Sequence, residues 1–231
     1  MRHFSLVLAL VYLGVAAAAH AQAGDPSQPA PASTANPELL QRYGEFAFGP
    51  TFGHKLGGMF GGEVSMPFKH IQFFVEGGRM TNTATADLQN AANVITGVLS
   101  AAGSASSKVK QPVNYVAVGG RYELPMEGRI HPYGLVGVGV AKVEKDVRFL
   151  VNGNDVTSQL LDVYGVQLGR DLAGSQTKAL LEVGVGAHVN LNAGFLGDRW
   201  FGDASYRYGR VFLEGQGLNT SRIQFGIGTT F

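Results

Sequence analysis

Charged side chains that could do acid–base or electrostatic chemistry occupy alternate positions within apolar stretches of this chain. The candidate set is Glu63, Glu76, Arg121, Glu123, Glu182, His188, Asp203 and Arg207. Glu182, for example, lies between Leu181 and Val183. A buried charge persists only when it is paired and hydrogen-bonded, so these residues predict an internal polar network in which carboxylates face guanidinium groups. Within it we expect Glu182 and Arg207 to be cross-strand neighbours.

The histidines give little support to a catalytic site. Hydrolysis of a lipid or peptide would need a His beside a nucleophile or carboxylate. Of the six His in the sequence, only His54 is placed for that role, and no spacing of partner residues supports it. The absence of Cys excludes disulfides and thiolate metal ligands. We therefore predict no catalytic residue, no cofactor and no metal site.

The elements that must position the charged residues are stretches of about ten residues with the period of a β-strand. We find eight: EFAFGPTFG, FGGEVSMPF, IQFFVEGG, NYVAVGGRYELP, YGLVGVGVA, LLEVGVGAHVNL, WFGDASYRYGRVF and SRIQFGIGTTF. Each has an apolar face and a face of glycines and polar residues. The last stretch is expected to pair with the first near Phe46 to Phe52 and so to close the sheet.

The N-terminal residues read as a targeting segment and a linker. A basic start and the apolar run FSLVLALVYLGVAAAA precede Ala19-His20-Ala21, which has the small-residue spacing of a signal-peptide cleavage site. A membrane anchor would need about 20 apolar residues, and this run is shorter. We predict a signal peptide over residues 1–21, a Pro/Ala-rich linker over 22–42 and one domain over 43–231.

Connection lengths and charge placement favour a barrel in a membrane. Long segments occupy roughly residues 81–111 and 145–177, and short turns alternate with them. Outer-membrane barrels have this asymmetry, with short periplasmic turns and longer external loops. An Arg or Lys facing lipid at mid-depth would cost about 2–4 kcal/mol, and only Arg79, Lys142 and Arg210, all toward the outer ends, take the apolar parity. A secreted lipocalin-like barrel would instead have an apolar lumen.

The signal peptide, the eight alternating stretches and the sequences YRYGRVF and FGIGTTF resemble the OmpA/OmpX-like outer-membrane β-barrel family over Tyr43 to Phe231. The expected fold is all-β: an eight-stranded antiparallel up-and-down transmembrane barrel with short periplasmic turns and two long external loops, one with a helix. The resemblance implies residence in the bacterial outer membrane. Its expected partners are outer-membrane lipid and lipopolysaccharide, the barrel assembly machinery and periplasmic chaperones. Phe231 resembles the aromatic C-terminal signal that this machinery reads.

The sequence is compatible with several hypotheses about the function. The first is a non-enzymatic structural or surface barrel whose lumen is plugged by side chains, and it is expected to be a monomer. The others are a narrow diffusion pore, in which the polar network would be an ion path or gate, and a lipid- or peptide-modifying enzyme. Near-neutral charge, with 18 Lys+Arg against 17 Asp+Glu, argues against nucleic acid as a partner.

The first long loop contains an amphipathic helical pattern. Leu88, Ala91, Ala92, Ile95 and Leu99 follow the i, i+3, i+4, i+7, i+11 spacing of one helix face. Such a helix could contact lipid or a partner outside the barrel. We favour a helix folded over the barrel mouth.

Overall fold

The computed structural model describes residues 41–126, 128–167, 172–191, 199–213 and 217–231. The described residues belong to one compact unit. The predicted signal peptide and most of the predicted linker lie outside the described residues. Among the described residues, no helix is long and apolar enough to cross a membrane.

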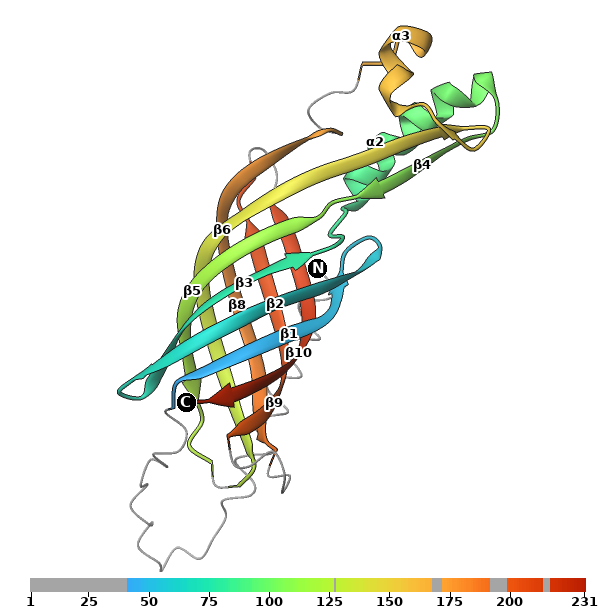
Figure 1. Cartoon of the computed structure of the whole chain (residues 1–231). Helices are drawn as coiled ribbons and strands as arrows, with labels where there is room; N and C mark the ends of the chain where they lie inside the picture. Colours follow the sequence, from blue (N-terminus) through green and yellow to red (C-terminus); the bar gives the residue numbers. More distant parts are fainter. Residues whose placement is uncertain (1–40, 127, 168–171, 192–198, 214–216) are drawn as a thin grey trace, which may run out of the picture. The chain divides into compact units, whose positions relative to one another are not determined.

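Eight antiparallel strands form a closed ring (Figure 1). They are β1 (Tyr43–Phe52), β2 (Leu56–Phe68), β3 (Ile71–Met80), β5 (Val113–Glu123), β6 (Ile130–Val151), β8 (Gly174–Asn190), β9 (Trp200–Val211) and β10 (Leu218–Thr230). The ring closes where β10 pairs with β1, with Phe46 opposite Ile227 and Phe48 opposite Phe225. Closure satisfies the backbone groups of both edge strands. The predicted all-β eight-stranded barrel and its closing strand pair are confirmed.

The outer face of the ring of strands is apolar and the inner face is polar, as the alternation in the sequence predicts. On β6, Val136, Val138 and Val140 point outward and are about half exposed. On β1, Phe46 and Phe48 point outward while Glu45 and Ala47 are buried. The outside of the ring is therefore an apolar band, and the polar residues of the same strands face the interior.

One ring strand, β6, continues past one end of the ring, and two shorter strands pair with it to form an extension. β6 runs on to Val151, where β4 (Ala105–Lys110) and the short β7 (Asn154–Asp155) pair with it. The expectation that a loop begins near residue 145 is therefore wrong. The strand continues because it pairs with β4 from Asp146 to Val151. It ends where Asn152 and Gly153, with φ of 51° and 83°, form a two-residue hairpin turn of the kind that needs φ > 0 at both positions.

Helical segments cover this extension and share an apolar core with it. They are α2 (Ala86–Leu99), η2 (Ser100–Ala102), η3 (Thr157–Gln159) and α3 (Leu160–Tyr164). The external core comprises Ala84, Leu88, Ala92, Leu99, Val109, Val147, Phe149, Val151, Val156, Leu160 and Leu172. The predicted helix thus exists, but its buried stripe packs on β4 and β6 and not over the barrel mouth. Figure 1 shows α2 beside β4 and the end of β6. The reason is that the extended strands offer an apolar face for it to cover.

Replacing Thr85 is expected to loosen α2 without disturbing the barrel. The Thr85 hydroxyl accepts a hydrogen bond from the Leu88 backbone N–H at 3.2 Å and so caps the helix. Thr85→Ala should cost about 1 kcal/mol of local helix stability, measured as faster hydrogen exchange of the α2 amides. Thr85→Ser keeps the cap and should exchange like the native chain. Equal protection in the Ala variant would contradict the capping role.

Candidate functional site

The structure places the eight predicted site residues on the inner face of the barrel. Seven are buried: Glu63, Glu76, Arg121, Glu182, His188, Asp203 and Arg207. Glu123 is half-buried near one rim, and its side chain is only 7% exposed. They come from β2, β3, β5, β8 and β9, so the alternation of five strands delivers them to one enclosed space.

Three arginines and three glutamates form a central ion-pair cluster: Arg121, Arg207 and Arg222 with Glu63, Glu76 and Glu182. The Arg207 guanidinium donates to Glu63 at 2.9 Å and also to Glu76. The Arg222 guanidinium donates to Glu76 and Glu182, each at 2.9 Å. Because each bridging arginine joins carboxylates from two other strands, the cluster crosslinks the wall across the lumen.

Arg121 connects this cluster to an aromatic layer. Its Nη2 donates to Glu63 at 2.8 Å, and its guanidinium carbon lies 4.0 Å from the centre of the Tyr133 ring. The Tyr43 hydroxyl donates to Glu63 at 2.5 Å, and the Tyr133 hydroxyl donates to Asp203 at 2.6 Å. A cation over an aromatic face and charge-assisted hydrogen bonds both stabilise buried charge.

The expected Glu182–Arg207 pairing differs in register from the observed one. Arg207 lies opposite Gly184, and Glu182 lies opposite Gly209. Both side chains point inward, and Arg207 Nη1 is 3.8 Å from Glu182 Oε1. The contact is therefore diagonal, and Arg222 on β10 takes the closer position beside Glu182.

Sequence reasoning missed Arg222 and Glu45 as members of the interior set. Arg222 has no exposed surface and lies on the same parity of β10 as the buried Gln224. Glu45 is 6% exposed and shares the inward parity of β1 with Ala47. The alternation that identified the other residues was present at both positions and could have found them.

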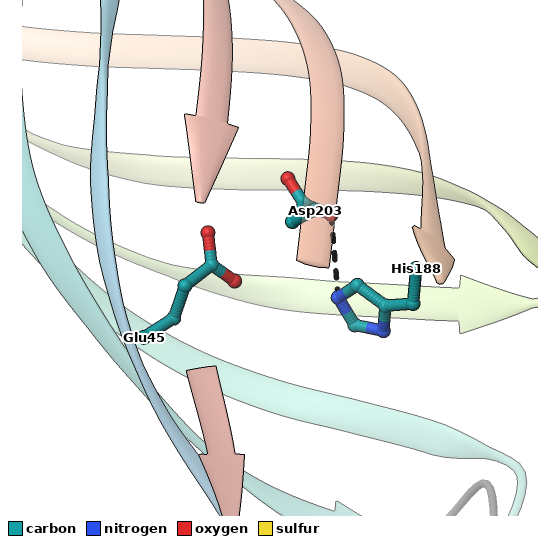
Figure 2. Close-up of side chains that lie close together, drawn as sticks. All are labelled: Glu45, His188 and Asp203. Carbon is teal, nitrogen blue, oxygen red and sulfur yellow. Dashed lines mark ion pairs between the residues drawn. The ribbon is translucent and has the colours of Figure 1, made fainter. Parts of the chain in front are cut away.

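Glu45, His188 and Asp203 form a second group, the carboxylate–histidine cluster (Figure 2). One polar atom from each residue lies within 4.8 Å of the others. His188 is directly opposite Asp203 on β8 and β9, and its Nε2 is 3.3 Å from Asp203 Oδ2. Imidazole nitrogen and carboxylate oxygen are metal ligands, so these are the described residues best suited to hold a cation.

The family described as outer membrane protein β-barrel domain matches residues 5–231. The chain belongs to this family. Membership assigns the ring of strands to the bacterial outer membrane, which agrees with the apolar band on its outside.

Solved outer-membrane barrels are similar to this chain at low sequence identity. Neisserial surface protein A is 12% identical with a TM-score of 0.51, and the match covers 83% of this chain and 97% of that one. The N-terminal barrel of Pseudomonas aeruginosa OprF is 12% identical with a TM-score of 0.45, covering 83% and 99%. The outer-membrane enzyme PagL is 12% identical with a TM-score of 0.41, covering 82% and 99%. No curated protein sequence matches the chain.

Proposed function

We propose that this outer-membrane barrel is a non-enzymatic structural and surface protein whose lumen is plugged by its own side chains. The observation that carries the proposal is the central ion-pair cluster. Arg121, Arg207 and Arg222 have no exposed surface, and each is bonded to glutamates of other strands. An eight-stranded barrel has an interior just wide enough for side chains to fill, so these pairs occupy the space that a pore would need.

The external end supplies a surface for contacts outside the membrane. The extension has its own apolar core, so it is a built structure that projects from the barrel. Its helices expose apolar side chains, with Val94 and Val98 of α2 at 71% and 60% and Leu161 and Val163 of α3 at 59% and 63%. Exposed apolar side chains that gather on one structure are a feature of interaction surfaces, and loops commonly carry such specificity.

The proposed lipid partners are outer-membrane lipid and lipopolysaccharide. The apolar band of the wall suits acyl chains. Arg79, Lys142 and Arg210 point outward from the strands that lead toward the extension, and their side chains are exposed. Cationic side chains at a membrane surface attract anionic headgroups, so these three residues suit the phosphate groups of lipopolysaccharide.

Planar bilayers containing the folded chain are expected to show no steady single-channel steps. If the ion-paired side chains plug the lumen as proposed, conductance should match bilayers that received detergent alone. The folded state of the inserted protein is checked by its faster migration before boiling on a denaturing gel. Steady, reproducible steps would contradict the plugged lumen and favour the narrow-pore alternative.

Deletion of Phe231 is expected to impair insertion into the outer membrane while export across the inner membrane continues. We propose Phe231 as the residue read by the barrel assembly machinery, with periplasmic chaperones as transient partners. Phe231 is 72% exposed and therefore accessible, while its backbone N–H donates to the Arg42 carbonyl at 2.9 Å beside β1. Fractionation of cells should find the deletion variant in the periplasm. Phe231→Tyr keeps an aromatic terminus and should assemble; full assembly of the deletion variant would contradict the role.

A further inference from the structure

We propose that Glu45, His188 and Asp203 form a binding site for a divalent metal ion of the zinc class inside the barrel. This goes beyond the proposed plug and replaces the sequence-based expectation of no metal site. His188 and Asp203 come from β8 and β9, which pair directly. Glu45 comes from β1, which reaches them only because the ring closes through the pairing of β10 with β1.

The buried charges of the barrel do not balance. Among the described side chains of the interior, six carboxylates face three guanidinium groups; these are Glu45, Glu63, Glu76, Glu123, Glu182 and Asp203 against Arg121, Arg207 and Arg222. The central ion-pair cluster uses three carboxylates for its three arginines. Glu45, Glu123 and Asp203 remain, all close to His188 or within its cluster. Uncompensated buried charge is strongly unfavourable, so an additional cation at this place would stabilise the fold.

The environment of the Glu45 carboxylate is the main evidence for a bound ligand. It is 6% exposed, and among the described residues neither of its carboxylate oxygens has a hydrogen-bond partner. Oδ1 of Asp203 is also without one in the described part of the chain. Figure 2 shows the Glu45 carboxylate directed toward the space between Asp203 and the His188 ring. Buried carboxylate oxygens are almost always hydrogen-bonded or bound to a cation.

Gly226 makes room for the Glu45 carboxylate. It lies on β10, between β1 and β9, and is the direct neighbour of both Ala47 and Asp203. A Cβ atom at position 226 would come within 2.6 Å of Glu45 Cδ. The glycine therefore lets the carboxylate reach across one strand toward Asp203, where a larger residue would push it away.

The distances suit a small tetrahedral ion. Zinc binds His nitrogen and carboxylate oxygen at about 2.0–2.2 Å, which puts two tetrahedral ligands about 3.4 Å apart. His188 Nε2 and Asp203 Oδ2 are already 3.3 Å apart, and a small movement of Glu45 would bring in the third ligand. Three protein ligands leave a fourth position for water. Calcium and magnesium prefer six or more oxygens, so the imidazole favours zinc.

A further carboxylate lies beside the second nitrogen of the imidazole. His188 Nδ1 is 3.1 Å from Oε1 of Glu123, on the side away from Asp203. Metal-binding His residues commonly direct their second nitrogen to a carboxylate, which selects the tautomer and leaves the other nitrogen for the ion. Glu123 is therefore a positioning residue and not a ligand.

Binding of the ion requires Arg121 to lose its contact with the His188 ring. Its Nη1 is 2.5 Å from His188 Nε2, the nitrogen that would take the metal. Its Nη2 bond to Glu63 and its position over the Tyr133 ring remain available. A small rotation of the guanidinium thus releases the histidine without leaving the arginine unpaired.

The test is zinc binding by the full chain folded in detergent micelles. After dialysis against Zn²⁺ and then against metal-free buffer, elemental analysis should find one zinc per chain, and the thermal unfolding temperature should rise with Zn²⁺ but not with Mg²⁺. Glu45→Gln and Asp203→Asn should abolish the retained zinc. Glu45→Gln keeps the side-chain shape and removes an unpaired charge, so it should fold, as verified by circular dichroism and gel mobility. Glu123→Gln should weaken binding about 10- to 100-fold.

Exposed histidines supply the matched control. His54 and His70 lie in turns outside the cluster and are exposed, so the variant with His54→Ala and His70→Ala should retain zinc as the native chain does. Gly226→Ala should lower affinity by displacing Glu45. Zinc that persists in Glu45→Gln, or that is lost only from the His54/His70 variant, would overturn the proposal. Failure of the native chain to retain zinc would overturn it too and would indicate that protons neutralise the cluster.

Discussion

Arg207→Met is expected to destabilise the folded barrel by about 3–5 kcal/mol, because removal of one partner leaves uncompensated buried charge. Arg207 has no exposed surface and bridges Glu63 and Glu76. Methionine fills part of the volume but cannot donate to either carboxylate. The free energy of unfolding is measured by denaturant titration of the protein in micelles or lipid vesicles, with the tryptophan fluorescence or gel mobility as signal.

The control for Arg207→Met is an ion pair on the outside. Lys142 and Glu144 lie 2.9 Å apart with side chains 50% and 33% exposed. Exposed pairs contribute about 0–1 kcal/mol, so Lys142→Met should change the unfolding free energy by no more than that. Equal losses in the two variants would show that burial of the central ion-pair cluster is not what stabilises the barrel.

Val138→Arg is expected to cost about 2–4 kcal/mol, the penalty for arginine on the lipid face at mid-depth. Val138 points outward from the middle of the barrel part of β6, lies opposite Val118 and Leu181, and is 56% exposed in the absence of lipid. Loss of unfolding free energy should appear in lipid vesicles, where the guanidinium must be buried among acyl chains.

The matched substitution for Val138→Arg is Val94→Arg. Val94 is 71% exposed on α2, which packs on the extension beyond the ring. Because this helix is expected to be in water, the arginine there should change the unfolding free energy by less than about 0.5 kcal/mol, as surface substitutions usually do. Similar costs at both positions would argue against a lipid-facing wall.

The interior shows where prediction from sequence was sufficient and where it was not. Alternation assigned Glu63 and Asp203 to the inner face, because the side-chain period of a strand is two. It could not say which carboxylate meets which arginine. That depends on register, and the two-residue difference between the expected and observed partners of Arg207 made its contact with Glu182 diagonal.

The external end was predicted less well for a related reason. The helical stripe that includes Leu88 and Leu99 was visible in the sequence, since it requires only local spacing. Its partner was not, because Val147 and Phe149 were assigned to a loop, whereas they continue β6 and form the surface that the helix covers. Strand length beyond the barrel depends on pairing with β4, which is a contact between distant segments.

The sequence by itself determined the number of barrel strands, the face on which each charged residue lies, and the closing pair of strands, because all three follow from a local alternation and its repetition along the chain. Only the tertiary structure decided which charges meet. Closure of the ring places Glu45 of β1 beside Asp203 of β9 across Gly226, and it brings Arg222 between Glu76 and Glu182. The physical reason is that contacts across the lumen depend on the shear of the barrel, the register of its strands and the space left by a glycine. These are properties of the closed ring, and no single strand determines them.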